Sequence, residues 1–297
     1  MGDAAPITLK RLCLYGLWLL LSVVIFWGPS TALIRYSLGN DNASHILLIP
    51  LISASLLYFE QKGIFAELSH DYVSAAILIV LSIGTSLWAA HFRTVWSASG
   101  VLGAYILALL FVWVAGFALL FGRSALKNAR FSLLFLLLMV PLPDFLLNYV
   151  IYYLQKGSAD IAEMIFDLAG VPALRDGFIF HLAHLSIEVA KECSGIRSSL
   201  ALLILALLVG HLFLRTAWKQ AVFVVVGLVL MIVKNGIRIA TLTILAQYVD
   251  SGFLYGRLHH EGGVVFFLIG LVLLFPVFWL LQRSEGRSGT LADAGTI

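Results

Sequence analysis

The chain has 297 residues, of which 61% are hydrophobic and only 12% are charged, whereas a soluble domain carries about 25% charged residues. With a mean hydropathy of +0.99, this composition excludes an ordinary soluble fold and indicates a multispan membrane protein. The net charge of +3 gives no basic face for nucleic acid. The two cysteines, Cys13 and Cys193, are too few for a disulfide framework or a Cys-rich metal cluster.

Apolar runs between charged residues predict about eight transmembrane helices, so the fold class is all-α and polytopic. The second run is short enough to be tilted or re-entrant. Pro141 and Pro143 interrupt the fifth and predict two half-helices, because proline removes a backbone donor. We expect one integral membrane domain over 1–283 and a disordered tail over 284–297. The predicted spans are 12–33, 46–59, 73–90, 101–121, 131–153, 196–214, 221–249 and 264–281.

Lysine and arginine collect on the side of a membrane from which the chain is not translocated, so their positions predict its orientation. Arg197, Lys234 and Arg238 lie within or at the end of spans rather than in loops. Both termini are then predicted to be cytoplasmic, and the segment 155–192 faces outward. With the N-terminus inside, the inner loops hold ten of the nineteen Lys and Arg residues, namely Lys10, Arg11, Lys62, Arg123, Lys127, Arg130, Arg215, Lys219, Arg283 and Arg287.

The outward segment before the sixth span predicts a short helix followed by a hairpin. Residues 157–169 place Ile161, Ile165 and Leu168 at helical spacing, and 178–189 are rich in β-branched and aromatic residues. His181 and His184 have the i, i+3 spacing of a metal-ligand pair, but on a strand they face opposite sides. We therefore predict no metal and no other cofactor.

Three chemically active side chains far apart in the sequence are predicted to lie at one membrane surface. Cys193 directly precedes the sixth span, and His259 lies in the loop before the eighth. The seventh span enters from inside near Lys219, and about 19 residues at 1.5 Å each bring Arg238 roughly 28 Å across, to the same outer face. Taken singly, each has an ordinary explanation, as a packing cysteine, a snorkelling arginine or a loop histidine. Their matching depth favours a functional site.

The chemistry of these three residues suits the cleavage and re-formation of amide bonds. A helix N-terminus and Arg197, one turn away, favour the thiolate of Cys193 as a nucleophile. A histidine takes the thiol proton and returns it to a leaving amine, and an arginine in a poorly hydrated site stabilises the oxyanion. The sequence therefore predicts a membrane-embedded cysteine enzyme.

The segments around these residues resemble the three signature segments of the exosortase/archaeosortase family. They read Glu-Cys-Ser-Gly-Ile-Arg-Ser at 192–198, Asn-Gly-Ile-Arg-Ile at 235–239 and His-His-Glu-Gly-Gly at 259–263. Two upstream segments also resemble the family, at 42–53, with Ser44-His45 followed by Pro50, and at 139–143, with its Met-x-Pro-Leu-Pro pattern. The resemblance covers about residues 35–281, and the Cys-Ser-Gly-x-Arg-Ser segment is the most specific part.

This resemblance implies a multi-pass inner-membrane cysteine transpeptidase or protease with its active site on the extracytoplasmic face. Its partners would be membrane lipid and exported proteins that carry a C-terminal sorting signal, made of a Pro-Glu-Pro-like motif, a transmembrane helix and a basic tail. The catalytic cysteine, arginine and histidine of the family fall on Cys193, Arg238 and His259, with His260 as the alternative to His259. The family often has Ala before the cysteine, whereas this chain has Glu192, which raises the thiol pKa unless Arg197 or Lys191 offsets it.

Four further residues are candidate supporting groups, and two other functions compete with the enzyme. Asn235 lies three residues before Arg238 and either orients its guanidinium or bonds within the bundle. The others are Ser194, His45 and Asn148. One competing function is a transporter of an anionic solute, which Lys234, Arg238 and the broken fifth span would serve. The other is a non-catalytic assembly subunit of the cell envelope, in which Cys193 is a packing residue.

Overall fold

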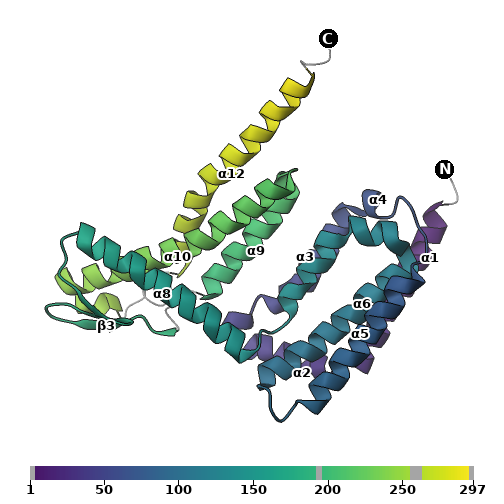
Figure 1. The fold of residues 1–297 in the computed structure, drawn as a ribbon, viewed down its shortest axis with the longest axis horizontal. Helices are drawn as coiled ribbons and strands as arrows, with labels where there is room; N and C mark the ends of the chain where they lie inside the picture. The colour runs from purple at the N-terminus through teal and green to yellow at the C-terminus, as the bar shows by residue number, and fades with distance from the viewer. Residues whose placement is uncertain (1–3, 192–195, 255–262, 294–297) are drawn as a thin grey trace. The chain divides into compact units, whose positions relative to one another are not determined.

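The structure is a computed structural model that describes residues 4–191, 196–254 and 263–293 (Figure 1). The chain divides into two compact units, Met1–Leu147 and Asn148–Ile297. Unit 1 is helical, and unit 2 combines helices with a small antiparallel sheet. Within these described ranges, five helices are long and apolar enough to cross a membrane, and up to seven crossings result if each of two bent helix pairs is one span. The chain is thus an all-α polytopic membrane protein, and the count of eight stays a prediction.

Unit 1 is built around the antiparallel pair α5 and α6, which pack through small side chains. Ala75 of α5 shares a buried cluster with Ala115 and Ala118 of α6. Small residues let two helices approach closely where lipid gives no hydrophobic driving force. The elements are α1 (Ala4–Ile25), α2 (Trp27–Gly39), η1 (Asp41–Ala43), η2 (Ile46–Leu48), α3 (Ile49–Phe59), α4 (Gln61–Ile64), α5 (Tyr72–His91), α6 (Ala98–Asn128), α7 (Arg130–Phe135) and η3 (Leu136–Met139).

Helix α1 lies against α6 through Trp18, whose indole Nε1 donates to the carbonyl of Val112 at 2.9 Å. A Cβ on Gly116 would collide with the Trp18 ring, so only glycine fits this position. Near the end of α6, Gly122 has a φ of +86° and the chain turns. Arg11 of α1 donates to the carbonyls of Ser69 and Leu120 at 2.9 and 2.8 Å, and these bonds attach α1 to that turn.

The first expected span is divided in the structure, contrary to the prediction of one helix over 12–33. Helices α1 and α2 meet at Phe26 with a bend of 84°. Pro29 explains the break, because it has no N–H for the carbonyl of Ile25 and its ring clashes with that carbonyl. The predicted break in the fifth span is confirmed, since Arg130–Met139 and Asp144–Leu168 are bent by 94° at the segment with Pro141 and Pro143.

Unit 2 comprises most of α8 (Asp144–Leu168), the strands β1 (Leu174–Asp176), β2 (Ile179–His181) and β3 (Ser186–Glu188), and the helices α9 (Ile196–Phe213), α10 (Ala217–Tyr248), η5 (Ser251–Leu254) and α12 (Gly263–Asp293). The strands pair antiparallel in the order β1-β2-β3, with Phe180 opposite both Arg175 and Ile187. The last two strands lie inside the segment 178–189 for which strand was expected.

The expected short helix at 157–169 is instead the second half of α8, because between Asp144 and Leu168 the sequence has no proline to stop it. The expected apolar face is confirmed for Ile161, which lies against Gly236 of α10, and for Ile165, which packs on the buried cluster, but it is wrong for Leu168. Leu168 is 81% exposed, whereas Ala159, Ala162 and Phe166 form the buried face. These three pack with Phe180 of β2 and with Ile239 and Ala240 of α10 in one hydrophobic cluster, so the sheet and α10 share a core with α8.

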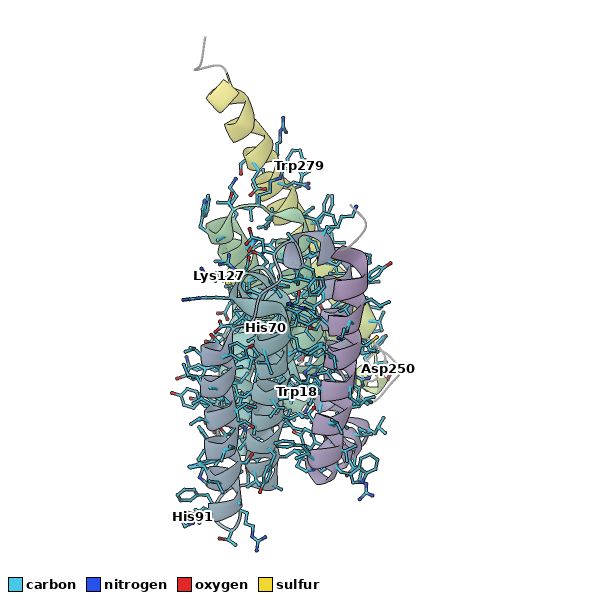
Figure 2. The ribbon with its side chains drawn as sticks, turned by 90° about the vertical axis from the view of Figure 1, so that its right-hand side faces the viewer. Trp18, His70, His91, Lys127, Asp250 and Trp279 are labelled. Atoms are coloured by element: carbon cyan, nitrogen blue, oxygen red, sulfur yellow. The ribbon has the colours of Figure 1, made fainter. Side chains whose placement is uncertain are left out.

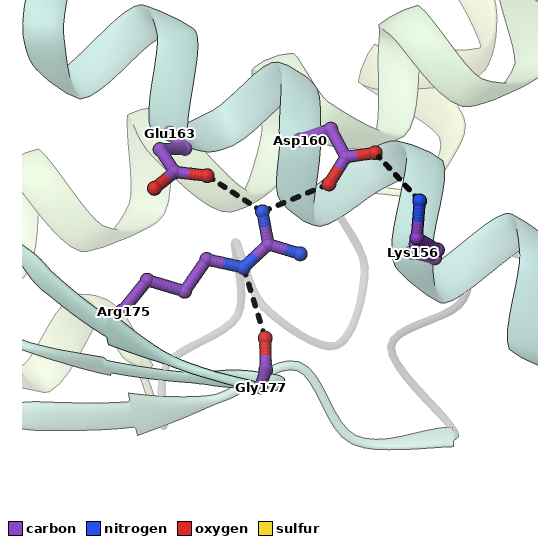
Figure 3. Close-up of polar contacts among 5 residues, drawn as sticks. All are labelled: Lys156, Asp160, Glu163, Arg175 and Gly177. Atoms are coloured by element: carbon purple, nitrogen blue, oxygen red, sulfur yellow. Dashed lines mark hydrogen bonds and ion pairs between the residues drawn. The ribbon is translucent and has the colours of Figure 1, made fainter.

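An ion-pair cluster also connects the sheet to α8 (Figure 3). The guanidinium of Arg175 donates to Asp160 Oδ1 at 2.8 Å and to Glu163 Oε2 at 2.6 Å, while its Nε donates to the carbonyl of Gly177 at 2.9 Å. Lys156 lies 3.7 Å from the second oxygen of Asp160. Arg175 therefore holds β1 and the following turn against the exposed side of α8.

Helices α9, α10 and α12 form an antiparallel three-helix group. Going up α10, Lys219 Nζ donates to Ser284 Oγ at 2.8 Å, the rings of Phe223 and Phe278 lie 5.9 Å apart, and the side chain of Lys234 reaches Gly270. The residue numbers of the partners on α12 decrease as the residue numbers on α10 increase, so the two helices are antiparallel. Helix α9 is antiparallel to α10 by the same reasoning, since Gly210 faces Phe223 and Ser198 bonds Lys234.

The stretch after Arg283, expected to be disordered, is helical as far as Asp293 because α12 continues through it. Glu285 accepts hydrogen bonds from the backbone N–H groups of Arg215 and Thr216 at 3.0–3.1 Å, and so satisfies donors at the start of α10. The expectation of a single membrane domain over 1–283 stays a prediction.

Candidate functional site

Arg238 lies on α10, in the part of that helix that packs with α8, the sheet, α9 and α12. Its neighbours Ile239 and Ala240 are buried in the cluster shared with α8 and the sheet. One turn earlier, Lys234 is only 2% exposed and its amine donates to Ser198 Oγ of α9. The same lysine side chain lies against Gly270 of α12. Arg238 is half-buried between these two sets of contacts.

The helix pairing places Arg238 at one particular end of the three-helix group. Ser198, Lys234 and Gly270 lie at one level, and Arg238 lies four residues, or about 6 Å, further along α10. In the same direction, α9 begins two residues beyond Ser198 and α12 begins seven residues beyond Gly270. The end of the group that carries Arg238 is therefore the end at which both α9 and α12 begin.

Cys193, Ser194, His259 and His260 lie outside the described residues. Cys193 precedes the first residue of α9 by three positions, and His259 precedes the first residue of α12 by four.

The chain leading to Cys193 is held firmly up to Val189. The N–H of Val189 donates to the carbonyl of Phe178 at 2.9 Å, and its carbonyl accepts from Gln155 Nε2 of α8 at 2.8 Å. Its side chain is 2% exposed and belongs to the cluster that contains Ile239 and Ala240. On the far side of Cys193, Ser198 is bonded to Lys234. Before Cys193 the chain thus shares a buried cluster with Ile239 and Ala240 of α10, and after it Ser198 bonds Lys234 of α10.

A close crossing of α8 and α10 supports this arrangement. Asn235 Nδ2 donates to Ser158 Oγ at 3.0 Å, and both side chains are buried. A Cβ on Gly236 would lie 2.5 Å from atoms of Ile161, and one on Gly157 would lie 2.7 Å from Ile232. Glycine is therefore required where the two helices touch. The bond to Ser158 accounts for the Nδ2 group of Asn235, and both roles predicted for this residue stay predictions.

The remaining predicted residues of the described chain lie on α9, in unit 1 and on α8. Arg197 is exposed on the first turn of α9. His45 belongs to unit 1, where it precedes η2 and hydrogen-bonds the backbone at Leu138 and Asn42. Partial burial lowers the pKa of His45, and those two hydrogen bonds act in the opposite direction. Asn148 is exposed near the start of α8.

The two upstream segments singled out in the sequence lie against each other in unit 1. His45 contacts the backbone at Leu138, directly before the Met-x-Pro-Leu-Pro segment. Eight residues after His45, Ser53 Oγ donates to the carbonyl of Ser132 at 2.7 Å. No sequence pattern predicts the contact between the segments 42–53 and 139–143.

Gln155, Ser158 and Ser198 join these elements and were not among the predicted site residues. Gln155 and Ser158 are polar residues on the face of α8 that also carries Ala159 and Ala162, and both are buried. A polar residue at helical spacing within a face of small residues is a signal that could have identified them.

Among the described residues, no group of three or more His, Cys, Asp or Glu side chains is arranged to hold a metal ion. His181 Nδ1 lies 2.9 Å from Ser186 Oγ.

A family model described as transmembrane exosortase (Exosortase_EpsH) matches residues 35–276. The match covers both units and every predicted site residue. The chain therefore belongs to the transmembrane exosortase family. No curated protein and no solved structure matches the chain.

Proposed function

We propose that this exosortase-family membrane protein is a cysteine peptidase or transpeptidase that cleaves the C-terminal sorting signal of exported proteins on the extracytoplasmic side. Cys193 is the nucleophile, Arg238 stabilises the oxyanion and His259 is the general acid and base, with His260 as the alternative. The observation that carries the proposal is that the chain before Cys193 shares a buried cluster with Ile239 of α10, and the chain after it is bonded to Lys234 of α10.

Chain reach limits how far Cys193 can lie from that part of α10. Val189, buried in the cluster with Ile239, is four residues away, a span of at most roughly 14 Å. Ile196, which begins α9, is three residues away, at most roughly 11 Å. Both limits are compatible with a thiol next to the Arg238 guanidinium.

The same reasoning supports a histidine from the segment before α12. Helix α12 is antiparallel to α10 and begins at the end of the group that carries Arg238. His259 precedes Gly263 by four residues, a span of at most roughly 14 Å. Three segments far apart in sequence can then contribute one group each to a common site.

The first half of the proposed reaction breaks an amide bond. His259 takes the proton of Cys193 Sγ, and the sulfur attacks the scissile carbonyl carbon. Arg238 donates hydrogen bonds to the oxyanion of the tetrahedral intermediate. The C–N bond then breaks as His259 returns its proton to the leaving amine, which leaves the exported protein as a thioester on Cys193.

The second half releases the exported protein. An amine of an envelope component, or water, gives a proton to His259 and attacks the thioester carbonyl, and the thiolate of Cys193 leaves and is reprotonated. An amine acceptor makes the enzyme a transpeptidase, and water makes it a protease. The segment that follows the scissile bond in the substrate remains in the membrane with its helix.

Co-expression with a protein that carries a sorting signal tests the proposal. Mass spectrometry of the processed protein should show a new C-terminus before its transmembrane helix, and Cys193→Ala should abolish it. Cys13→Ala is the matched control, because Cys13 is an exposed cysteine on α1 in unit 1. Normal processing by Cys193→Ala would show that the nucleophile is assigned wrongly. His259→Ala and His260→Ala, compared in the same assay, decide between the two histidines.

A further inference from the structure

A groove on unit 1 combines an apolar lining with a cation, and no part of the proposed reaction uses it. It has a volume of about 330 Å³ and lies between α5, α6 and the broken span α7–η3. Its floor includes Leu110 and Leu133, which are 3% and 7% exposed, whereas Leu134 on its rim is 62% exposed. The lining residues are Leu78, Leu107, Leu110, Phe111, Val114, Leu126, Arg130, Leu133, Leu134 and Leu137.

Arg130 lies at one end of this groove, next to the turn between α6 and α7. Helix α7 is antiparallel to α6, because Gly100 and Gly103 near the start of α6 contact Pro143 and Pro141, whereas α7 begins beside the end of α6. The groove therefore extends from Arg130 into the apolar interior of the span. Arg130 is exposed, and within the described residues its guanidinium has no carboxylate partner.

Two further cations lie close to Arg130 at the same end of unit 1. Lys127 is exposed in the last turn of α6, and Figure 2 shows it at the opposite end of this unit from His91. Asn128 Nδ2 donates to the carbonyl of Gly63 at 3.0 Å, which brings α4 and its exposed Lys62 to this turn. The charge count predicts that this end is cytoplasmic. Clusters of cations at the cytoplasmic end of spans attract anionic lipid.

The leucine-rich lining of the groove and the cation at its end suit an occupant with an apolar chain and an anionic head. An unbranched hydrocarbon chain can follow a narrow leucine-lined groove, and a phosphate at its mouth can accept two hydrogen bonds from a guanidinium.

We propose that this groove binds one phospholipid with an anionic headgroup, its acyl chain between α6 and α7 and its phosphate on Arg130. The lipid fills the space beside the broken span and so stabilises the position of α7. This site is independent of the proposed peptidase activity, since none of its residues belongs to unit 2.

A second groove on the same unit provides an internal comparison. It has a volume of about 450 Å³ and lies between α1, α5 and α6, with Trp18, Ser82 and Leu87 among its lining residues. Its lining contains no charged residue. This groove offers an acyl chain a similar surface but gives no preference for an anionic headgroup.

Native mass spectrometry of the purified full-length protein, incubated with equal amounts of phosphatidylglycerol and phosphatidylcholine, tests the proposal. We expect wild type to retain phosphatidylglycerol preferentially. Arg130→Gln should reduce the ratio of the two bound lipids about fivefold, the factor expected for one cation near an anionic headgroup. Arg130→Lys should keep most of the preference. All of these changes are at an exposed position, and size-exclusion chromatography checks that each variant stays monodisperse.

Two matched controls make the test specific. Leu134→Trp fills the groove at its exposed rim and should remove the preferentially bound lipid, whereas Leu87→Trp, at a 66% exposed position of the second groove, should leave the preference unchanged. Lys127→Gln should change the ratio less than Arg130→Gln does, because Lys127 does not line the groove. An unchanged ratio in Arg130→Gln would overturn the proposal. An equal loss in Lys127→Gln would overturn it too, because the preference would then arise from general surface charge.

Discussion

Gln155 and Val189, 34 residues apart, are joined by a buried hydrogen bond of 2.8 Å from the side-chain amide of Gln155 to the carbonyl of Val189. This bond fixes the end of the small sheet to α8, four residues before Cys193. Three residues further along α8, Ser158 bonds Asn235 of α10. One face of α8 therefore supports both the segment leading to the proposed nucleophile and the helix that carries the proposed oxyanion-stabilising arginine.

We expect Gln155→Leu to reduce processing about tenfold while the protein still accumulates in the membrane. The substitution leaves the buried carbonyl of Val189 without that donor, which costs about 1–3 kcal/mol. The rate of substrate processing and the rate at which Cys193 is alkylated across a pH range are the measurements. Gln61→Leu, at an exposed position of α4, is the control. A pH profile of alkylation identical to wild type would refute a positioning role for Gln155.

Lys234 and Lys219 provide a matched pair on α10. Both are buried, at 2% and 6% exposure, and each donates to a serine of a neighbouring helix. Lys234 lies one turn from Arg238, whereas Lys219 lies in the first turn of α10. We expect Lys234→Met to lower processing at least tenfold and Lys219→Met to lower it less than threefold. Methionine keeps the volume of the side chain, so both variants should retain most of their thermal stability in detergent. Equal effects on processing would show that Lys234 acts only through folding.

Gly236→Ala should destabilise unit 2. The added Cβ would lie 2.5 Å from Ile161 and 3.0 Å from the carbonyl oxygen of Ser158, so α8 and α10 must separate. Overpacking of this kind costs about 1–3 kcal/mol. Gly84→Ala on α5 is the control, because nothing lies within 4 Å of the added atom. Alanine favours a helix by about 1 kcal/mol over glycine, so the control should be neutral or stabilising. Thermal unfolding in detergent measures both, and a stable Gly236→Ala variant would contradict the close crossing.

His45 should make the stability of unit 1 depend on pH. Partial burial lowers the pKa of His45 in the folded state below the unfolded value of about 6.5. The unfolded state then binds more protons, so this contribution to stability is complete above pH 6.5 and decreases as the pH falls from there through the lower folded-state pKa. Thermal unfolding between pH 4.5 and 8, compared for wild type and His45→Gln, measures it. The decrease should be smaller in His45→Gln, and equal slopes would exclude His45 as the cause.

The amino-acid sequence by itself determined the class of the protein and most of its helices. Apolar runs of the right length predict α5, α6, α9, α10 and α12 because a helix that crosses a bilayer needs about 20 predominantly apolar residues. Proline interrupts a helix wherever it occurs in the helix interior, so Pro141 and Pro143 predicted the break before α8. The effect of Pro29 was missed because the apolar run continues on both sides of it. The resemblance of the segments at 192–198, 235–239 and 259–263 predicted the family to which the chain belongs.

Only the tertiary structure decided which residues support the predicted site. Hydrophobicity alone did not predict how closely α8 and α10 approach, because Ile161 packs on Gly236, Ile232 packs on Gly157, and Ser158 bonds Asn235 across the crossing. The bonds of Gln155 to Val189 and of Lys234 to Ser198 join positions 34 and 36 residues apart. Such pairs depend on the register and crossing of packed helices, which local sequence patterns do not encode.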